Sequence, residues 1–182
     1  MDRRDRGCVF NALPLEIQAV QNYRRLAEQV KDLEMKKYLE LFEANEQSHI
    51  EALKEIISKY ANSEGMRELD EKMKEPMNNP VDFSAELREI ITKLLELEEL
   101  QVKKYSNCTA VAQNIEIREI FYHFIENEKL HAELLKKMIL SLTIKEPPKD
   151  NKCEICGTQL ASHLHICHGC AKKEMEKSTR HK

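Results

Sequence analysis

Apolar residues recur at alternating spacings of three and four along most of the chain, which is the period of helices that pack side by side. The pattern predicts four helices, over about 14–30, 32–60, 84–112 and 114–140. Pro14 suits a first helical position, and Asp32 and Asn114 are good N-caps. The segment between the second and third helices, residues 62–83, contains one glycine and two prolines and is too long for a tight turn.

Short loop, long connection, short loop is the connectivity of ferritin-like bundles. We therefore expect an all-α, ferritin-like four-helix bundle with a long crossover between its second and third helices, occupying residues 1–144. One oddity is shared by all four helices, because a glutamate stands on each packing seam where the pattern requires an apolar residue. These seam glutamates are Glu16, Glu46, Glu98 and Glu128.

The two halves of the bundle match each other at an offset of 82 residues. Each half contains a Glu-x-x-His motif, a second glutamate thirty residues before it, and a tyrosine seven residues after that glutamate. The matched residues are Glu16 and Glu98, Tyr23 and Tyr105, Glu46 and Glu128, and His49 and His131. Asn45 and Asn127 also match, and either support of the motif or inherited sequence explains them. We interpret the repeat as a duplicated helical hairpin.

The spacing places the seam glutamates at one depth. In each hairpin both glutamates lie about 15 residues from the connecting loop, or roughly 22 Å along the helix. Buried carboxylates without a counter-charge are costly, and no Lys or Arg lies on the seams. Two divalent cations would neutralise them, and carboxylate with imidazole suits iron or manganese.

This hypothesis assigns a role to each matched residue. Glu46 and Glu128 would bridge two metal ions, and Glu16 and Glu98 would be terminal ligands. The two histidines, His49 and His131, would complete the coordination, while Tyr23 and Tyr105 are candidate hydrogen-bond donors to the ligands. The alternative for the tyrosines is ordinary core packing.

A second candidate metal site lies near the end of the sequence. After a charged linker at 145–150, two Cys-x-x-Cys pairs predict one tetrahedral thiolate site, formed by Cys153, Cys156, Cys167 and Cys170. Residues 145–182 therefore read as a linker and a small rubredoxin-like or zinc-ribbon domain that ends in a charged tail. Iron would make it a one-electron carrier, and zinc would make it structural. We expect His163, His165 and His168 to face solvent, Cys108 to be structural, and Cys8 to be an unused thiol in a loose N-terminal tail.

Composition narrows the class of protein. Charged residues reach 34%, aromatic residues are only 5% and tryptophan is absent, which disfavours a β-sandwich or barrel. A net charge of −3 gives no electrostatic reason to expect binding to nucleic acid or to a membrane. With no apolar run of about 20 residues and no signal-like start, we expect a soluble cytoplasmic protein, in which cysteines serve as thiols or ligands.

Taken together, these motifs resemble the rubrerythrins, in which a di-iron bundle precedes a rubredoxin-like iron–sulfur domain. The resemblance rests on the Glu16 and Tyr23 spacing, the two Glu-x-x-His motifs, the Glu98 and Tyr105 spacing, and the cysteine pairs. It implies reduction of hydrogen peroxide in oxidative-stress defence, with electrons passing from thiolate-bound iron to the di-iron site, often across a subunit interface. We accordingly expect a homodimer, an electron-donor protein, and peroxide or dioxygen as the oxidant.

Three features depart from the family pattern. Rubrerythrins usually carry a further ligand glutamate where this chain has Gln101, which bears on peroxidase efficiency. The gap between the cysteine pairs is short, and the usual aromatic and proline residues around them are missing. The sequence also ends soon after the second pair, in a charged tail, and these last two departures favour zinc. The sequence therefore leaves iron and zinc open for the four-cysteine site.

Two other functions fit the same residues. A ferritin-like ferroxidase or iron-handling protein would use the same six bundle ligands without a redox-active appendage. A di-metal bundle with a structural zinc ribbon would instead recruit a partner. The leading hypothesis remains a peroxide-reducing di-iron oxidoreductase.

Overall fold

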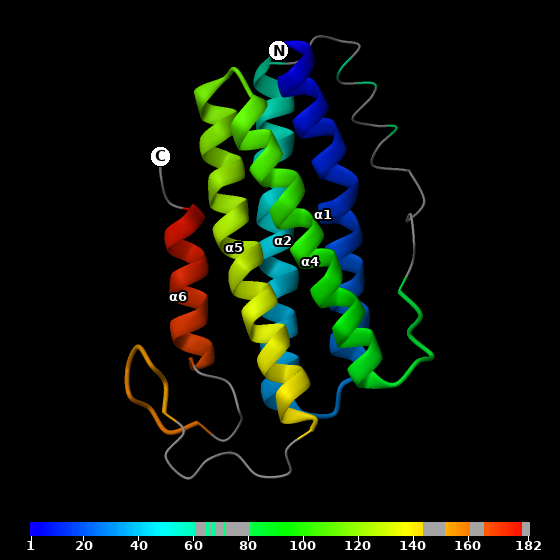
Figure 1. Cartoon of the computed structure of the whole chain (residues 1–182), viewed down its shortest axis with the longest axis vertical. Helices are drawn as coiled ribbons and strands as arrows, with labels where there is room; N and C mark the ends of the chain where they lie inside the picture. Colours follow the sequence, from blue (N-terminus) through cyan, green and yellow to red (C-terminus); the bar gives the residue numbers. More distant parts are fainter. Residues whose placement is uncertain are drawn as a thin grey trace.

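The computed structural model of the chain describes residues 1–60, 65, 67, 71, 81–143, 152–160 and 166–179. Within these residues it is all-helical and contains no named strand, as the sequence predicts (Figure 1). An isolated antiparallel bridge joins Lys152 and Gln159. The helices are α1 (Arg3–Gln29), α2 (Leu33–Tyr60), α4 (Leu87–Val111), α5 (Ile115–Ser141) and α6 (His168–Thr179).

Two antiparallel hairpins, α1 with α2 and α4 with α5, pack into the four-helix bundle (Figure 1). The amino group of Met1 donates to the carbonyl of Tyr60 at 3.1 Å, and Asp5 accepts from the amide of Gln113 at 2.7 Å. The start of α1, the end of α2 and the α4–α5 loop therefore share one end of the bundle. Since α4 begins at the opposite end, the connection from α2 to α4 joins opposite ends, which confirms the crossover topology. Most of the predicted crossover, 62–83, lies outside the described residues.

The predicted N-caps of the second and fourth helices are confirmed. The carboxylate of Asp32 accepts from the amide of Met35 at 2.8 Å, and the side chain of Asn114 accepts from the amide of Glu116 at 2.8 Å. The third helix begins at Leu87 rather than near Ser84. Its start is delayed because Asp82 accepts from both the amide and the hydroxyl of Ser84, which favours a turn there.

The first helix begins eleven residues earlier than the sequence analysis predicts, at Arg3, and Pro14 lies inside it. Asp2 caps the helix by accepting from the amides of Arg4 and Asp5. Pro14 costs one backbone hydrogen bond, but the preceding turns gain the burial of apolar side chains. The buried side chains are those of Cys8, Val9, Phe10, Ala12 and Leu13. The prediction that Cys8 lies in a loose tail is therefore wrong.

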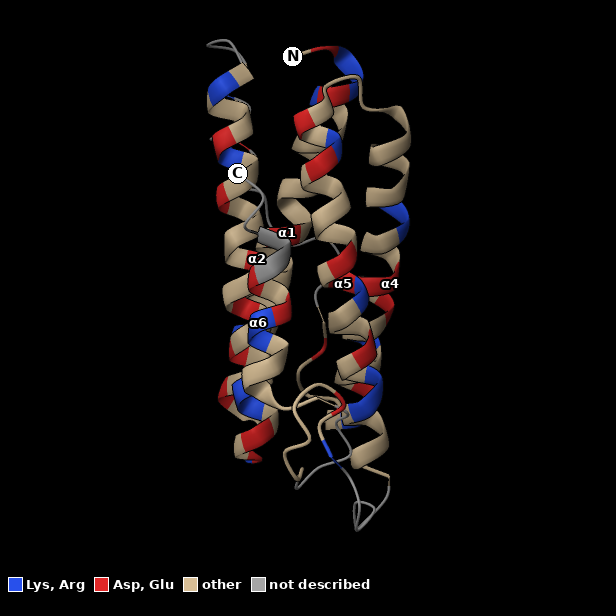
Figure 2. Cartoon of the chain, turned by 90° about the vertical axis from the view of Figure 1, so that its left-hand side faces the viewer, with Lys and Arg blue, Asp and Glu red and all other residues tan. Residues whose placement is uncertain are grey.

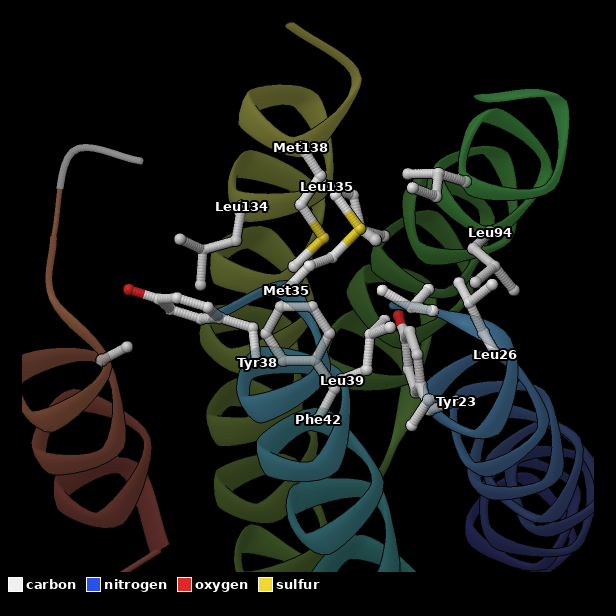
Figure 3. Close-up of a cluster of buried hydrophobic side chains, with 14 of the residues drawn as sticks. Tyr23, Leu26, Met35, Tyr38, Leu39, Phe42, Leu94, Leu134, Leu135 and Met138 are labelled. Atoms are coloured by element: carbon white, nitrogen blue, oxygen red, sulfur yellow. The ribbon is translucent and has the colours of Figure 1, made fainter. Parts of the chain in front are cut away.

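The apolar core forms two clusters, one towards each end of the bundle, with a band of buried polar residues between them. Figure 3 shows the cluster that extends from Tyr23 and Leu26 on α1 through Met35 and Tyr38 on α2 to Met138 on α5. Basic and acidic residues are interspersed along the helices (Figure 2). Among the described residues, no helix is long and apolar enough to cross a membrane.

The charged segment after the second cysteine pair forms a helix, α6, which packs against α2 and α5. Ala171 and Met175 of α6 are buried and belong to the same apolar cluster as the bundle residues. Their spacing of four residues places them on one helix face, which drives the packing. The predicted linker, 145–150, lies outside the described residues, and the division of the chain at residue 144 stays a prediction.

Candidate metal centres

The seam glutamates and motif histidines converge at mid-height in the bundle, where α1, α2, α4 and α5 meet. They form two groups whose candidate ligand atoms all lie within 4.8 Å of one another. One group is Glu16, Glu46, His49 and Glu128, and the other is Glu46, Glu98, Glu128 and His131. Glu46 and Glu128 belong to both groups, so these two carboxylates lie between the two clusters.

Each histidine directs its Nδ1 atom at three carboxylates. Nδ1 of His49 lies 3.2 Å from Glu16, 3.2 Å from Glu46 and 3.4 Å from Glu128. Nδ1 of His131 lies 2.9 Å from Glu46, 3.4 Å from Glu98 and 3.1 Å from Glu128. Each histidine thus contacts both seam glutamates of its own half and the Glu-x-x-His glutamate of the other half. This symmetry is what a duplicated hairpin predicts.

The two tyrosines connect the halves crosswise. The hydroxyl of Tyr23 on α1 donates to Glu98 on α4, and that of Tyr105 on α4 donates to Glu16 on α1. Each tyrosine therefore contacts the glutamate of the other half, not the one two turns away on its own helix. Gln101, where the family usually has a glutamate, is buried and donates to the hydroxyl of Tyr105 at 3.3 Å.

Burial controls the ionisation of this site. It raises the pKa of Glu16 to about 8, with repulsion from Glu46 adding to the shift, and it raises the pKa of Glu98 well above the ordinary value. Burial and repulsion between carboxylates oppose ionisation of Glu46 and Glu128 too. The pKa of Glu46 is nevertheless lowered by Glu16 and the nearby histidines, and that of Glu128 by the histidines. No lysine or arginine is buried among the described residues, so the histidines are the only cationic partners at hand there.

The histidine and tyrosine pKa values follow from the same carboxylates. Burial opposes protonation of His49 and His131, yet the surrounding carboxylates raise the pKa of both well above the usual value. Burial and the nearby carboxylates raise the pKa of Tyr23 and Tyr105, so both hydroxyls keep their protons.

Several buried polar atoms at this centre have no hydrogen-bond partner, which is rare inside proteins. They include both carboxylate oxygens of Glu46, one of Glu98 and one of Glu128. Nδ1 of His131 lies 2.9 Å from Oε1 of Glu46, but the orientation of the two groups does not make a hydrogen bond. Hard oxygen atoms left unpaired around two imidazole nitrogens are the donor set that iron or manganese takes, so the residues fit a pair of divalent cations.

The two matched asparagines of the repeat, Asn45 and Asn127, make different contacts. Nδ2 of Asn127 lies 3.0 Å from Nε2 of His49. In the other half, Oδ1 of Asn45 and Nε2 of His131 are both buried without a partner. The amide of Asn127 on α5 therefore contacts the histidine of the other half, His49 on α2, and the equivalent contact between Asn45 and His131 is not formed.

Aromatic rings close the site on two sides. The ring of Phe42 lies 4.5 Å from that of His131, and the ring of Phe124 stacks on that of His49 at 4.0 Å. Phe42 and Phe124 occupy matched positions of the repeat and are buried. The rings keep the dielectric low around the carboxylates.

The four cysteines of the C-terminal pairs also come together in space, as Cys153, Cys156, Cys167 and Cys170. The first pair turns through Gly157, whose φ of 74° needs a glycine and whose amide donates to the carbonyl of Cys153 at 2.8 Å. The second pair lies at the start of α6, and the amide of Cys167 donates to the sulfur of Cys153 at 3.3 Å. The cluster fits a tetrahedral metal site.

Two thiols of this cluster, those of Cys153 and Cys156, have lowered pKa values. Burial opposes ionisation of Cys153, but backbone amides around its sulfur lower its pKa to about 6. The hydroxyl of Thr158 lowers the pKa of Cys156. Burial raises the pKa of Cys170 to about 12, a cost that a bound cation removes.

His168 differs from its predicted solvent-facing role. It is half-buried, and its ring lies 5.8 Å from that of Tyr38 in an edge-on contact. The hydroxyl of Tyr38 also donates to the carbonyl of Ile166 at 2.5 Å. Tyr38 was not among the predicted site residues, since a tyrosine on an apolar helix face gives no signal of such a contact. His163 and His165 lie outside the described residues.

Comparison with known proteins gives one match. A family model described as rubrerythrin matches residues 9–139, more than half of the chain. The matched range includes both glutamate–histidine clusters and ends before the first cysteine pair. No curated protein and no solved structure matches the chain.

Proposed function

Because the chain belongs to the rubrerythrin family, we propose that it is a non-haem di-iron oxidoreductase that reduces hydrogen peroxide to water. The observation that carries the proposal is the pair of buried ligand groups that share Glu46 and Glu128. Such a pair accounts both for the family membership and for carboxylates that are otherwise buried without partners.

In this proposal each residue of the centre has a stated role. Glu46 and Glu128 would bridge two iron ions, Glu16 and Glu98 would be terminal ligands, and His49 and His131 would bind through Nδ1. The support for the bridging role is that both carboxylates belong to both groups. The support for Nδ1 is that this atom faces the carboxylates in each half.

Two iron ions at this centre would supply the two electrons that break the oxygen–oxygen bond of peroxide. The reaction also consumes two protons. Tyr23 and Tyr105 keep their hydroxyl protons and hold them beside Glu98 and Glu16, which orients these carboxylates. Phe42 and Phe124 limit the access of water.

We further propose that the four-cysteine site holds iron and relays electrons to the bundle, with an external protein as the donor. The support is the contact between this module and α2 of the same chain. The ring of His168 touches that of Tyr38, and Phe42, one turn further along α2, touches the ring of His131. One turn of α2 thus separates the ring contact at the cysteine module from the ring contact at a predicted ligand of the bundle.

Metal analysis and oxidation kinetics test this function together. Anaerobically reduced protein that contains two ferrous ions in the bundle should be oxidised by one equivalent of hydrogen peroxide much faster than by dioxygen. Glu46→Ala should abolish metal binding in the bundle while the helices remain formed. The proposal fails if Glu46→Ala retains two bundle metals, or if peroxide does not oxidise the loaded wild-type protein.

The visible spectrum and elemental analysis identify the metal of the cysteine site. Iron there gives a coloured protein, as the relay requires. A colourless protein with zinc in this site would contradict the relay and would favour a structural module. Faster reaction with dioxygen and mineral accumulation would instead favour an iron-handling function.

A further inference from the structure

Two cysteines outside both metal centres face each other between α1 and α4. Cys8 is buried on α1, with 7% of its surface exposed, and Cys108 is half-buried on α4. Their thiols are close enough to share a hydrogen bond, and both are free. The pair is formed by the early start of α1, because a helix beginning at Pro14 would have left Cys8 outside the bundle.

Both thiols border the same surface cavity, of about 720 Å³. Three basic side chains also line it, those of Arg3, Arg4 and Lys104. Cationic surroundings and access to solvent distinguish reactive cysteines from inert ones, which are enclosed by apolar residues. The cavity gives a small polar oxidant a route to the pair.

The hydrogen bond between the two thiols shifts their pKa values in opposite directions. It lowers the pKa of Cys8, against the opposing effects of burial and of Asp5 and Asp2, while it raises the pKa of Cys108. Of the two, Cys8 is the sulfur whose ionisation the hydrogen bond favours, and Cys108 is the thiol that supports it. An ionised sulfur beside a second, protonated thiol is the arrangement in which oxidation of the first leads to a disulfide.

We propose that Cys8 and Cys108 form a peroxide-oxidisable dithiol that closes to a reversible disulfide between α1 and α4. The proposal rests on the proposed function only for its oxidant, hydrogen peroxide, because no metal takes part. This redox site goes beyond the ligands, tyrosines and cysteine pairs that the family resemblance implies.

The chemistry balances in two steps. The Cys8 thiolate attacks one oxygen of peroxide, so that a sulfur–oxygen bond forms, the oxygen–oxygen bond breaks, and the departing hydroxide takes a proton to become water. Cys108 then attacks the sulfenic sulfur, the disulfide forms, and a second water leaves with the Cys108 proton. Two thiols lose two electrons in total, and one peroxide gains them. A small thiol reductant restores the pair by exchange.

Peptide mapping tests the proposal, because the two cysteines lie in different tryptic peptides, 7–24 and 105–118, and the C-terminal cysteines lie in neither. The full chain, with its bundle iron already oxidised to the ferric state, is treated with one equivalent of hydrogen peroxide, alkylated and digested. We expect a linked 7–24/105–118 peptide that dithiothreitol releases. Cys8→Ser should lose the linked peptide, and Cys153→Ser should retain it.

The bundle variant Glu46→Ala separates this proposal from the proposed function. Since the dithiol needs no bundle metal, the linked peptide should form in this variant as it does in wild type. The proposal is overturned if Cys8 and Cys108 stay alkylatable after peroxide treatment, or if each is oxidised separately without a link. Either outcome leaves the oxidation of ferrous protein, and hence the test of the proposed function, unaffected.

Discussion

Four carboxylates and two imidazoles are buried at the centre of this bundle, and individually each is unfavourable there. The shifted pKa values express this cost, since two glutamates hold their protons and both histidines gain them. Two divalent cations would replace those protons as the counter-charge. Protonation of these side chains in the metal-free chain therefore indicates that the site requires a positive counter-charge.

The first prediction concerns pH and the metal-free chain. Glu16, with a pKa of about 8, and Glu98 hold protons in the folded chain up to a higher pH than in the unfolded chain, where such carboxyls ionise near 4.5. Their contribution to stability is therefore present at low pH and is lost as the pH rises. Between pH 5 and pH 8 we expect a loss on the order of 2 kcal/mol, or roughly 5 °C in melting temperature.

Thermal unfolding in the presence of a chelator measures this slope. His49 and His131 add to it with the same sign, since their raised pKa values also favour the folded chain at low pH. The control Glu16→Gln should flatten the slope, because its amide cannot ionise. A metal-free protein whose stability is constant or rises from pH 5 to pH 8 would contradict the protonation described here.

The second prediction compares the two asparagines of the repeat. Nitrogen and oxygen of the Asn127 side-chain amide exchange places when the amide is flipped, and Oδ1 then accepts from Nε2 of His49. This tautomer leaves the Nδ1 lone pair of His49 free for a cation. Asn127→Leu should therefore weaken metal binding by about 10–100-fold at one of two sites. Asn45→Leu is the matched control and should change affinity much less, since Oδ1 of Asn45 bonds no histidine. Equal losses in a calorimetric iron titration would refute this asymmetry.

Individual helices show what the sequence pattern could and could not predict. The α2 and α5 boundaries follow from Asp32 and Asn114, whose caps are local and readable. The start of α1 was missed because Pro14 is a strong local signal, whereas the buried face before it gains its stability from distant helices. The packing of α6 was missed for a similar reason, since Ala171 and Met175 form too short a pattern to stand out.

The third prediction concerns how α1 holds the α4–α5 loop. The buried carboxylate of Asp5 accepts from the amides of Gln113 and Asn114, so Asp5→Ala leaves both donors without a partner. We expect a loss of about 1–3 kcal/mol in the free energy of unfolding by urea. The exposed Asp82, whose bonds are to Ser84 nearby, is the control, and Asp82→Ala should change stability by less than about 0.5 kcal/mol. Equal effects would contradict the anchoring role.

The fourth prediction concerns α2 as the link between the two centres. Tyr38→Leu removes the contacts with Ile166 and His168 and should slow reduction of the bundle iron through the cysteine site severalfold. The spectrum of each separate metal site should be unchanged. Tyr122→Leu, at an exposed position on α5, is the control and should leave the rate as in wild type. An unchanged rate in Tyr38→Leu would place the electron path elsewhere.

The molecule as a whole combines a duplicated hairpin with a cysteine module that packs on it. The duplication made the mid-bundle centre readable from the sequence, because each matched residue recurs at the same offset and depth. The crossed bonds of Tyr23 and Tyr105 could not be read in this way, since they depend on how the two hairpins meet. Nor could the Cys8–Cys108 pair, which joins residues one hundred positions apart.

The central claim is that two cations hold these buried carboxylates, and anomalous diffraction at the iron edge tests it most directly. Crystals of the iron-loaded full chain should show two peaks in the bundle, both between Glu46 and Glu128, with one beside each histidine Nδ1. Glu128→Ala crystals should show neither peak. Carboxylates that lie as described with no anomalous scatterer between them, or peaks at any other place in the bundle, would contradict the account.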